Sequence, residues 1–350
     1  RGMPIGRSWV VNREGQRIAC TPRTGSHVVT ATILKGQLSR GRAAVHQQAF
    51  AALTEPVKLP EPREWTKRVV RLTSIEGHLG IDELLAKLDE AGEMGSDLVC
   101  LYEFVWMPVH GVVTAEAIAS GKVKAADYRR RIAEKADQWN MYVIVAGIIE
   151  SQEINEAIMY DRDGNEAGRY RKIVSTYEAQ VLGTETPILE TDFARIGIHI
   201  CADEARVEID RCYGVKGADI VCVPTQSWGS DAWSRNLRDI SRAMDAGVFF
   251  VECNTAASEA LHRSVIIEPT GAILASGHHA RNSIVSVVVD LDNDRPKRYI
   301  REWTPREPAG YLPQYQHDEV PAVANDLRET ILLQRRPELY GVLKPEAPAD

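Results

Sequence analysis

The chain has 350 residues, of which 44% are hydrophobic and 26% are charged, and its formal net charge is −7. This composition predicts a globular protein with a substantial core, and the interspersed charges form no basic patch for nucleic acid or a membrane surface. No apolar run approaches about 20 residues, and the first residues lack the pattern of a signal peptide, so we expect a cytoplasmic protein without a transmembrane helix.

The N-terminal region contains a stretch that resembles a later part of the chain. Residues 8–34 align with residues 264–290 at a constant offset of 256 without gaps, with shared Ser, Gly and Ala positions. Two glycine-turn hairpins can look alike by chance. The alternative is an internal repeat, in which residues 1–60 are the tail of an upstream copy plus a linker rich in Pro and charge. We then expect two antiparallel strands joined near Glu14–Gly15.

The centre of the chain alternates between apolar runs and amphipathic segments. Helices are predicted at 81–95, where Gly95 ends the pattern, and at 125–140, 206–216 and 233–247. Strands are predicted at 69–75, 97–103, 142–150, on both sides of the turn at 161–166, and at 196–200, 219–224, 248–254, 264–276 (a hairpin) and 283–292. This pattern predicts layered sheets with helices outside them.

Three chemically active residues fall at or near strand ends. Glu103 closes one apolar run, Lys172 follows a predicted hairpin, and Cys201 directly follows the run at 196–200. Taken alone, Glu103 and Lys172 are equally consistent with solvated surface charges, and Cys201 with a thiol in the core. A helix start after Cys201 would lower the pKa of its thiol and supply N–H groups to an oxyanion.

Several spaced blocks resemble the nitrilase, or carbon–nitrogen hydrolase, superfamily. The blocks are DLVCLYE (97–103), GRYRK (168–172), IGIHICADEARVEIDRCYGVKGADIVCVPTQ (196–226) and SRAMDAGVFFVECNTA (241–256). The likeness covers roughly residues 68–305. It implies a four-layer α-β-β-α sandwich, with a catalytic domain at 66–305.

The resemblance also implies the roles of the site residues. Cys201 is the expected nucleophile, Glu103 the proton shuttle, and Lys172, with the N–H of Ala202, the stabiliser of the oxyanion. We therefore expect iodoacetamide to label Cys201 more slowly in Glu103→Gln. No metal and no cofactor are expected. The family's second pocket carboxylate is expected at Glu178, with Glu185 as the alternative.

Substrate specificity is less well defined by the sequence. Nitrile-cleaving members of the family usually carry Trp–Glu after the nucleophile, whereas this chain has Ala202–Asp203. This favours an amide or N-carbamoyl substrate over nitrile hydrolysis, acyl transfer to an amine or an inactive fold. Arg206 can bind a substrate carboxylate or be a surface charge. The pocket candidates, each just beyond a catalytic block, are Trp106, His110, Arg206, Gln226 and Trp228.

The remaining features concern cysteines, histidines and assembly. The six cysteines (20, 100, 201, 212, 222 and 253) have no paired spacing, which indicates reduced thiols, and no metal motif is present, although His278 and His279 could reach substrate. We expect a homodimer or higher homo-oligomer through the helices at 206–216 and 233–247. The tail at 306–350, with a helix predicted at 323–336, either reaches a neighbouring subunit or packs on its own domain.

Overall fold

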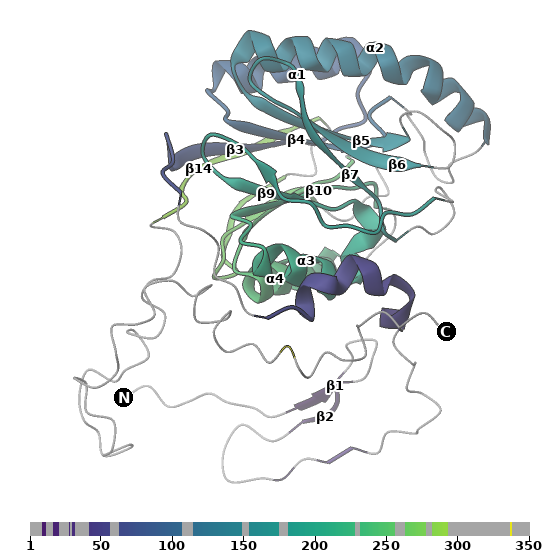
Figure 1. Ribbon diagram of the computed structural model, residues 1–350, viewed down its shortest axis with the longest axis vertical. Coiled ribbons are helices and arrows are strands. Elements are labelled where there is room, and N and C mark those ends of the chain that lie inside the picture. Colours follow the sequence, from purple (N-terminus) through teal and green to yellow (C-terminus); the bar gives the residue numbers. More distant parts are fainter. Residues whose placement is uncertain are drawn as a thin grey trace. The chain divides into compact units, whose positions relative to one another are not determined.

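The computed structural model describes residues 9–11, 17–20, 28, 30–31, 42–56, 63–106, 115–148, 154–174, 181–227, 232–255, 263–277, 282–292 and 337. The chain divides into two compact units, Arg1–Ala44 and Val45–Asp350. In the first unit, β1 (Trp9–Val11) pairs with β2 (Arg17–Cys20) in antiparallel fashion. The second unit contains two six-stranded sheets (Figure 1). Among the described residues, no helix is both long and apolar enough to cross a membrane.

The first large sheet has the strand order β14-β3-β4-β5-β6-β7. Its strands are β3 (Val69–Ile75), β4 (Leu98–Glu103), β5 (Tyr142–Ile148), β6 (Asn155–Tyr160), β7 (Glu166–Arg171) and β14 (Ile284–Asp290). The three central strands β3, β4 and β5 are parallel, and the outer strands are antiparallel to their neighbours. β4 is buried at every position, which explains why its sequence is a continuous apolar run rather than an alternating pattern.

The second large sheet has the order β13-β12-β11-β10-β9-β8. Its strands are β8 (Leu189–Glu190), β9 (Arg195–Ile198), β10 (Ile220–Pro224), β11 (Phe249–Cys253), β12 (Val265–Ile267) and β13 (Ile273–Ser276). Here too a parallel centre, β9-β10-β11, is flanked by antiparallel strands. The two sheets therefore share one arrangement, in which parallel central strands are flanked by antiparallel outer strands.

The sheets face each other, and helices cover their outer faces (Figure 1). The sulfur of Cys253 in β11 lies 3.2 Å from the carbonyl oxygen of Ile75 in β3. Helices α1 (Ile81–Glu93) and α2 (Ala115–Trp139) cover the first sheet, and α3 (Val207–Val215) and α4 (Ala232–Ala246) cover the second. This is the α-β-β-α sandwich that the sequence predicts.

Two helical segments differ from the prediction. α2 begins at Ala115, ten residues before the expected start. The sequence pattern did not reveal this first part of the helix, because it lacks a clear apolar stripe and contains Gly121. The 3₁₀ segment η2 (Arg42–Leu53) was not predicted at all. Its Phe50 is fully buried, and the thiol of Cys212 in α3 lies 3.7 Å from the carbonyl of Ala49.

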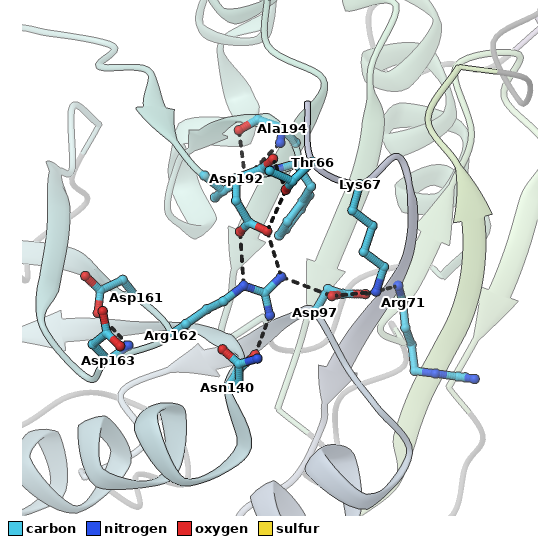
Figure 2. Close-up of polar contacts among 12 residues, drawn as sticks. Thr66, Lys67, Arg71, Asp97, Asn140, Asp161, Arg162, Asp163, Asp192 and Ala194 are labelled. Carbon is cyan, nitrogen blue, oxygen red and sulfur yellow. Dashed lines mark hydrogen bonds and ion pairs between the residues drawn. The ribbon is translucent and has the colours of Figure 1, made fainter. Parts of the chain in front are cut away.

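A charged cluster joins the two sheets at the amino ends of β4 and β9 (Figure 2). Arg162, in the turn between β6 and β7, lies with Nη2 3.1 Å from Asp97 and with Nε 3.0 Å from Asp192. Lys67 adds a second cation 2.8 Å from Asp97, and the Arg162 guanidinium stacks 5.2 Å from the ring of Tyr142. Asp97 precedes β4 and Asp192 precedes β9, whereas Glu103 and Cys201 lie at the carboxyl ends of these two strands. The cluster therefore links β4 and β9 at their amino ends.

Candidate active site

The carboxyl ends of strands from both sheets meet at one place. Glu103 is the last residue of β4, and its N–H donates to the carbonyl of Thr225, which follows β10, at 3.4 Å. Cys201 follows β9 in the same sheet as β10. Both strands end in a sharp turn, with positive φ at Phe104 (64°) and at Cys201 (46°). L-residues adopt this conformation at a cost that is typical of functional sites.

Glu103 and Lys172 form a buried ion pair. Lys172 Nζ lies 2.9 Å from Glu103 Oε1, and each side chain is only 2% exposed. The Asn155 side-chain amide donates to the same oxygen at 2.8 Å, and the Asn155 carbonyl accepts the Lys172 N–H at 2.9 Å. Because a buried polar or charged group is costly unless it is paired and hydrogen-bonded, these contacts offset the burial of both side chains.

The thiol of Cys201 experiences both of these charges. Its pKa is raised from an ordinary value of 9.0 to about 12, chiefly by burial and next by the carboxylate of Glu103, while the ammonium of Lys172 opposes this rise. The prediction that a helix start lowers this pKa is therefore wrong. Cys201 opens the five-residue 3₁₀ segment η3 (Cys201–Ala205), which is too short for a helix dipole to offset burial. The resting thiol is protonated and needs a base.

Asp203 connects the segment that carries Lys172 to the turn that carries Cys201. It is fully buried and accepts four hydrogen bonds: from the N–H groups of Ile200 (2.9 Å), Ile173 (3.1 Å) and Val174 (2.6 Å) and from the hydroxyl of Tyr170 (2.7 Å). Burial is the larger influence on this carboxyl and raises its pKa. Sequence reasoning treated Asp203 only as a specificity marker. Its hydrogen-bonding role depends on strand β7 lying beside η3, which no local pattern reveals.

Glu204, which is buried, pairs with the half-buried Arg238 near Cys201. The guanidinium of Arg238 in α4 contacts the carboxylate of Glu204, which is 1% exposed. The Arg242 guanidinium donates to the backbone carbonyl of Glu204 at 3.0 Å. Sequence reasoning missed this pair, because the arginines of α4 look like an ordinary solvated helix face. The Glu204 charge adds to those that raise the pKa of Cys201.

The described pocket candidates occupy different surroundings. Gln226 is largely buried, and its backbone carbonyl lies 3.8 Å from the sulfur of Cys201. Trp106 is fully buried against Gly147 of β5, where an added Cβ would lie 2.8 Å from the indole ring. Arg206 is half-buried, and its guanidinium lies 3.3 Å from the carbonyl of Ala205.

Other predicted positions are less informative. Ala202 is half-buried in η3, and Glu185 is exposed. Several positions lie outside the described residues: His110, Glu178, Trp228, His278, His279, the turn at Glu14–Gly15 and, apart from residue 337, the tail at 306–350. Among the residues that the structure describes, no group of three or more His, Cys, Asp or Glu is placed to hold a metal ion.

Comparisons with known proteins agree with the fold. A probable nitrilase from Schizosaccharomyces pombe is 31% identical over 172 residues, which are 44% of this chain and 62% of that protein. The chloroplastic omega-amidase of Arabidopsis thaliana is 27% identical over 228 residues, 57% of this chain and 61% of the relative. The aligned part thus spans less than two thirds of either relative.

Solved structures share the architecture at lower sequence identity. An amidase from Nesterenkonia sp. superposes with a TM-score of 0.57 at 20% identity, covering 69% of this chain and 100% of that one. A carbon–nitrogen hydrolase from Helicobacter pylori G27 gives 0.59 at 16% identity, covering 70% and 97%. The family model described as carbon-nitrogen hydrolase matches residues 73–299, more than half of the chain. The chain belongs to the carbon–nitrogen hydrolase family.

Proposed function

We propose that this protein hydrolyses a non-peptide C–N bond of a small amide or N-carbamoyl compound through a thioester on Cys201. One observation carries the proposal. The buried pair of Glu103 and Lys172, joined at 2.9 Å, acts electrostatically on the thiol of Cys201, which follows β9 of the facing sheet. A nucleophile, a base and a fixed cation are the groups that acyl transfer needs.

In the acylation step, the sulfur of Cys201 attacks the carbonyl carbon of the substrate while Glu103 accepts the thiol proton. Glu103 then gives this proton to the leaving nitrogen, the C–N bond breaks, and a thioester and an amine or ammonia result. A thiol with a pKa of about 12 is almost entirely protonated at neutral pH, so in this mechanism Glu103 removes the proton as the bond forms.

In the deacylation step, Glu103 takes a proton from water as the water oxygen attacks the thioester. The C–S bond breaks, and the sulfur of Cys201 regains a proton as the acid product leaves. Lys172 and the N–H of Ala202 stabilise the oxyanion in both steps. Removal of one such donor typically costs about 3 kcal/mol of transition-state stabilisation.

The substrate class follows from the relatives and from the residues near the thiol. In a mutant of the Nesterenkonia sp. AN1 amidase, the acetamide moiety of fluoroacetamide adds covalently at the active site cysteine. Glu178, Trp106, His110, Arg206, Gln226 and Trp228 remain our candidates for contacts with the substrate. Nitrile hydrolysis is the second candidate, favoured by the similarity to a probable nitrilase.

A hydrolysis screen tests the proposal. Ammonia release should be measured with simple primary amides, N-carbamoyl amino acids and nitriles, and hydroxylamine should trap the thioester as a hydroxamate. We expect turnover with an amide or a carbamoyl compound, complete loss in Cys201→Ala, and retained activity in the matched variant Cys212→Ala. Turnover of nitriles alone would favour the second candidate, and full activity of Cys201→Ala would refute the mechanism.

We also propose that the protein assembles through α4. Leu237 and Met244 lie seven residues apart on this helix and are 46% and 41% exposed. This spacing places them on one face, where two apolar side chains suit an isologous contact with a second copy.

A further inference from the structure

The N-terminal hairpin has the same bounds as a hairpin of the catalytic domain. Adding 256 to the residue numbers of β1 (Trp9–Val11) gives β12 (Val265–Ile267), and the same step takes β2 (Arg17–Cys20) to β13 (Ile273–Ser276). The sequence alignment predicts this offset without any knowledge of where the strands start and stop. The agreement of all four strand limits is therefore an independent observation.

The two hairpins also share their register and their irregularity. Trp9 pairs with Cys20 as Val265 pairs with Ser276, and both ladders shift at the same step, between the second and third residues of the first strand. A bulge at one defined step is a specific feature of a hairpin, whereas chance similarity of glycine turns requires only the turn.

The second strands also match in exposure. Ala19 is half-buried like Ala275, and Cys20 is exposed like Ser276. The first strands differ, because Val10 is half-buried whereas its counterpart Ile266 is fully buried. β12 owes this burial to β11, with which it pairs in antiparallel fashion. The N-terminal hairpin thus matches its counterpart except on the strand that lacks a neighbour of this kind.

The stretch after the N-terminal hairpin can be compared with β14 in the same way. Residues 28, 30 and 31 correspond to positions in β14, yet they belong to no strand. In the catalytic domain, β14 pairs with β3 of the other sheet and not with β13. A copy of β14 therefore needs a copy of β3 to form, whereas a copy of β12 and β13 can form a ladder by itself.

We propose that β1 and β2 are a second β12–β13 hairpin and that the outer edge of β1 pairs with a β11-type strand of a second carbon–nitrogen hydrolase domain, which precedes this one in the same polypeptide. Val10 would then face the position that Val251 of β11 occupies opposite Ile266. The inference rests on strand register and is independent of the proposed activity.

A hairpin exchange within the full chain tests this inference. Residues 266–276 are replaced by residues 10–20, and Val265 is kept, because Trp9 is far larger than the buried valine that it would replace. A second variant exchanges only residues 268–276 for 12–20. The matched control carries the same eleven residues as the full exchange, in reverse order.

The readouts are thermal unfolding and elution volume. If the N-terminal hairpin fits a β11-type strand, both exchange variants should unfold cooperatively within about 5 °C of the wild type, and the reversed control should unfold far lower or aggregate. The proposal is overturned if both exchange variants behave like the reversed control. It is equally overturned if the reversed control is as stable as the exchanges, because the site would then accept any sequence.

Discussion

The charge of Glu103 should slow the alkylation of Cys201 even though it promotes catalysis. The thiol has a pKa of about 12, with burial as the largest cause and Glu103 as the next. At pH 8 about one thiol in 10,000 is then ionised, against about one in ten at the ordinary value of 9.0. Glu103→Gln removes the negative charge and leaves the cation of Lys172 in place.

The direction of the change in the alkylation rate follows from the charge that is removed. Without the carboxylate, the thiolate is less disfavoured, so the pKa of Cys201 falls and the ionised fraction at a given pH rises. A fall of about one unit makes alkylation about tenfold faster. The sequence alone led us to expect slower labelling, and the structure reverses that expectation. Turnover should move in the opposite direction, by a loss of about 100-fold or more, because the base is missing.

Iodoacetamide labelling of Cys201, followed by mass spectrometry of its peptide from pH 7 to 11, measures this effect. The exposed Cys20 serves as an internal reference for reagent concentration. Labelling of the wild type should rise about tenfold per pH unit over this range. Glu204→Gln is the matched control and should accelerate labelling less, because Glu204 acts on the thiol more weakly than Glu103 does. Slower labelling in Glu103→Gln, or a plateau below pH 9 in the wild type, would refute this electrostatic reasoning.

Four further outcomes are expected. Asp203→Asn should lower kcat at least about tenfold and the free energy of unfolding by about 2 kcal/mol, as measured by kinetics and urea titration, because a charged acceptor of four hydrogen bonds is lost. Arg162→Met should lower the free energy of unfolding by about 2 kcal/mol with turnover unchanged, because Asp97 and Asp192 lose a shared cation. Leu237→Glu should convert an assembly into monomers in light scattering, and a monomeric wild type at micromolar concentration would contradict the α4 contact. Deletion of residues 1–41 should leave the melting temperature nearly unchanged, whereas deletion to residue 63 should lower it clearly, because Phe50 is fully buried.

The sequence predicted strands such as β4 and β10 well because each is an apolar run bounded by polar residues. β3 spans the predicted residues 69–75, and β4 ends at Glu103 as expected. The sandwich follows from these strands and from amphipathic helices such as α1, whose Leu84, Leu88 and Ala91 are buried at helical spacing. Local patterns of this kind are readable from the sequence because strands that are buried on both faces are rich in apolar residues.

The sequence did not reveal groups whose role depends on a neighbour from another part of the chain. Asp203 is important because β7 brings Tyr170 and the N–H groups of Ile173 and Val174 to it. The pairing of Glu204 with Arg238 requires α4 to cross behind η3. The direction of the Cys201 pKa shift was missed for the same reason, because burial is a property of the assembled sandwich and not of the turn.

The geometry at Cys201 connects these observations. A cysteine at φ 46° is strained by about 1–3 kcal/mol, and such strain persists only where the surroundings hold it. Asp203 provides this hold, because it accepts the Ile200 N–H just before the turn and the N–H groups just after Lys172. One buried carboxylate therefore keeps the nucleophile in its strained position and also fixes the segment that carries the cation. In the mechanism that we propose, a thiol with a raised pKa serves as the nucleophile because a base and a cation are held in place around it, and not because it is ionised at rest.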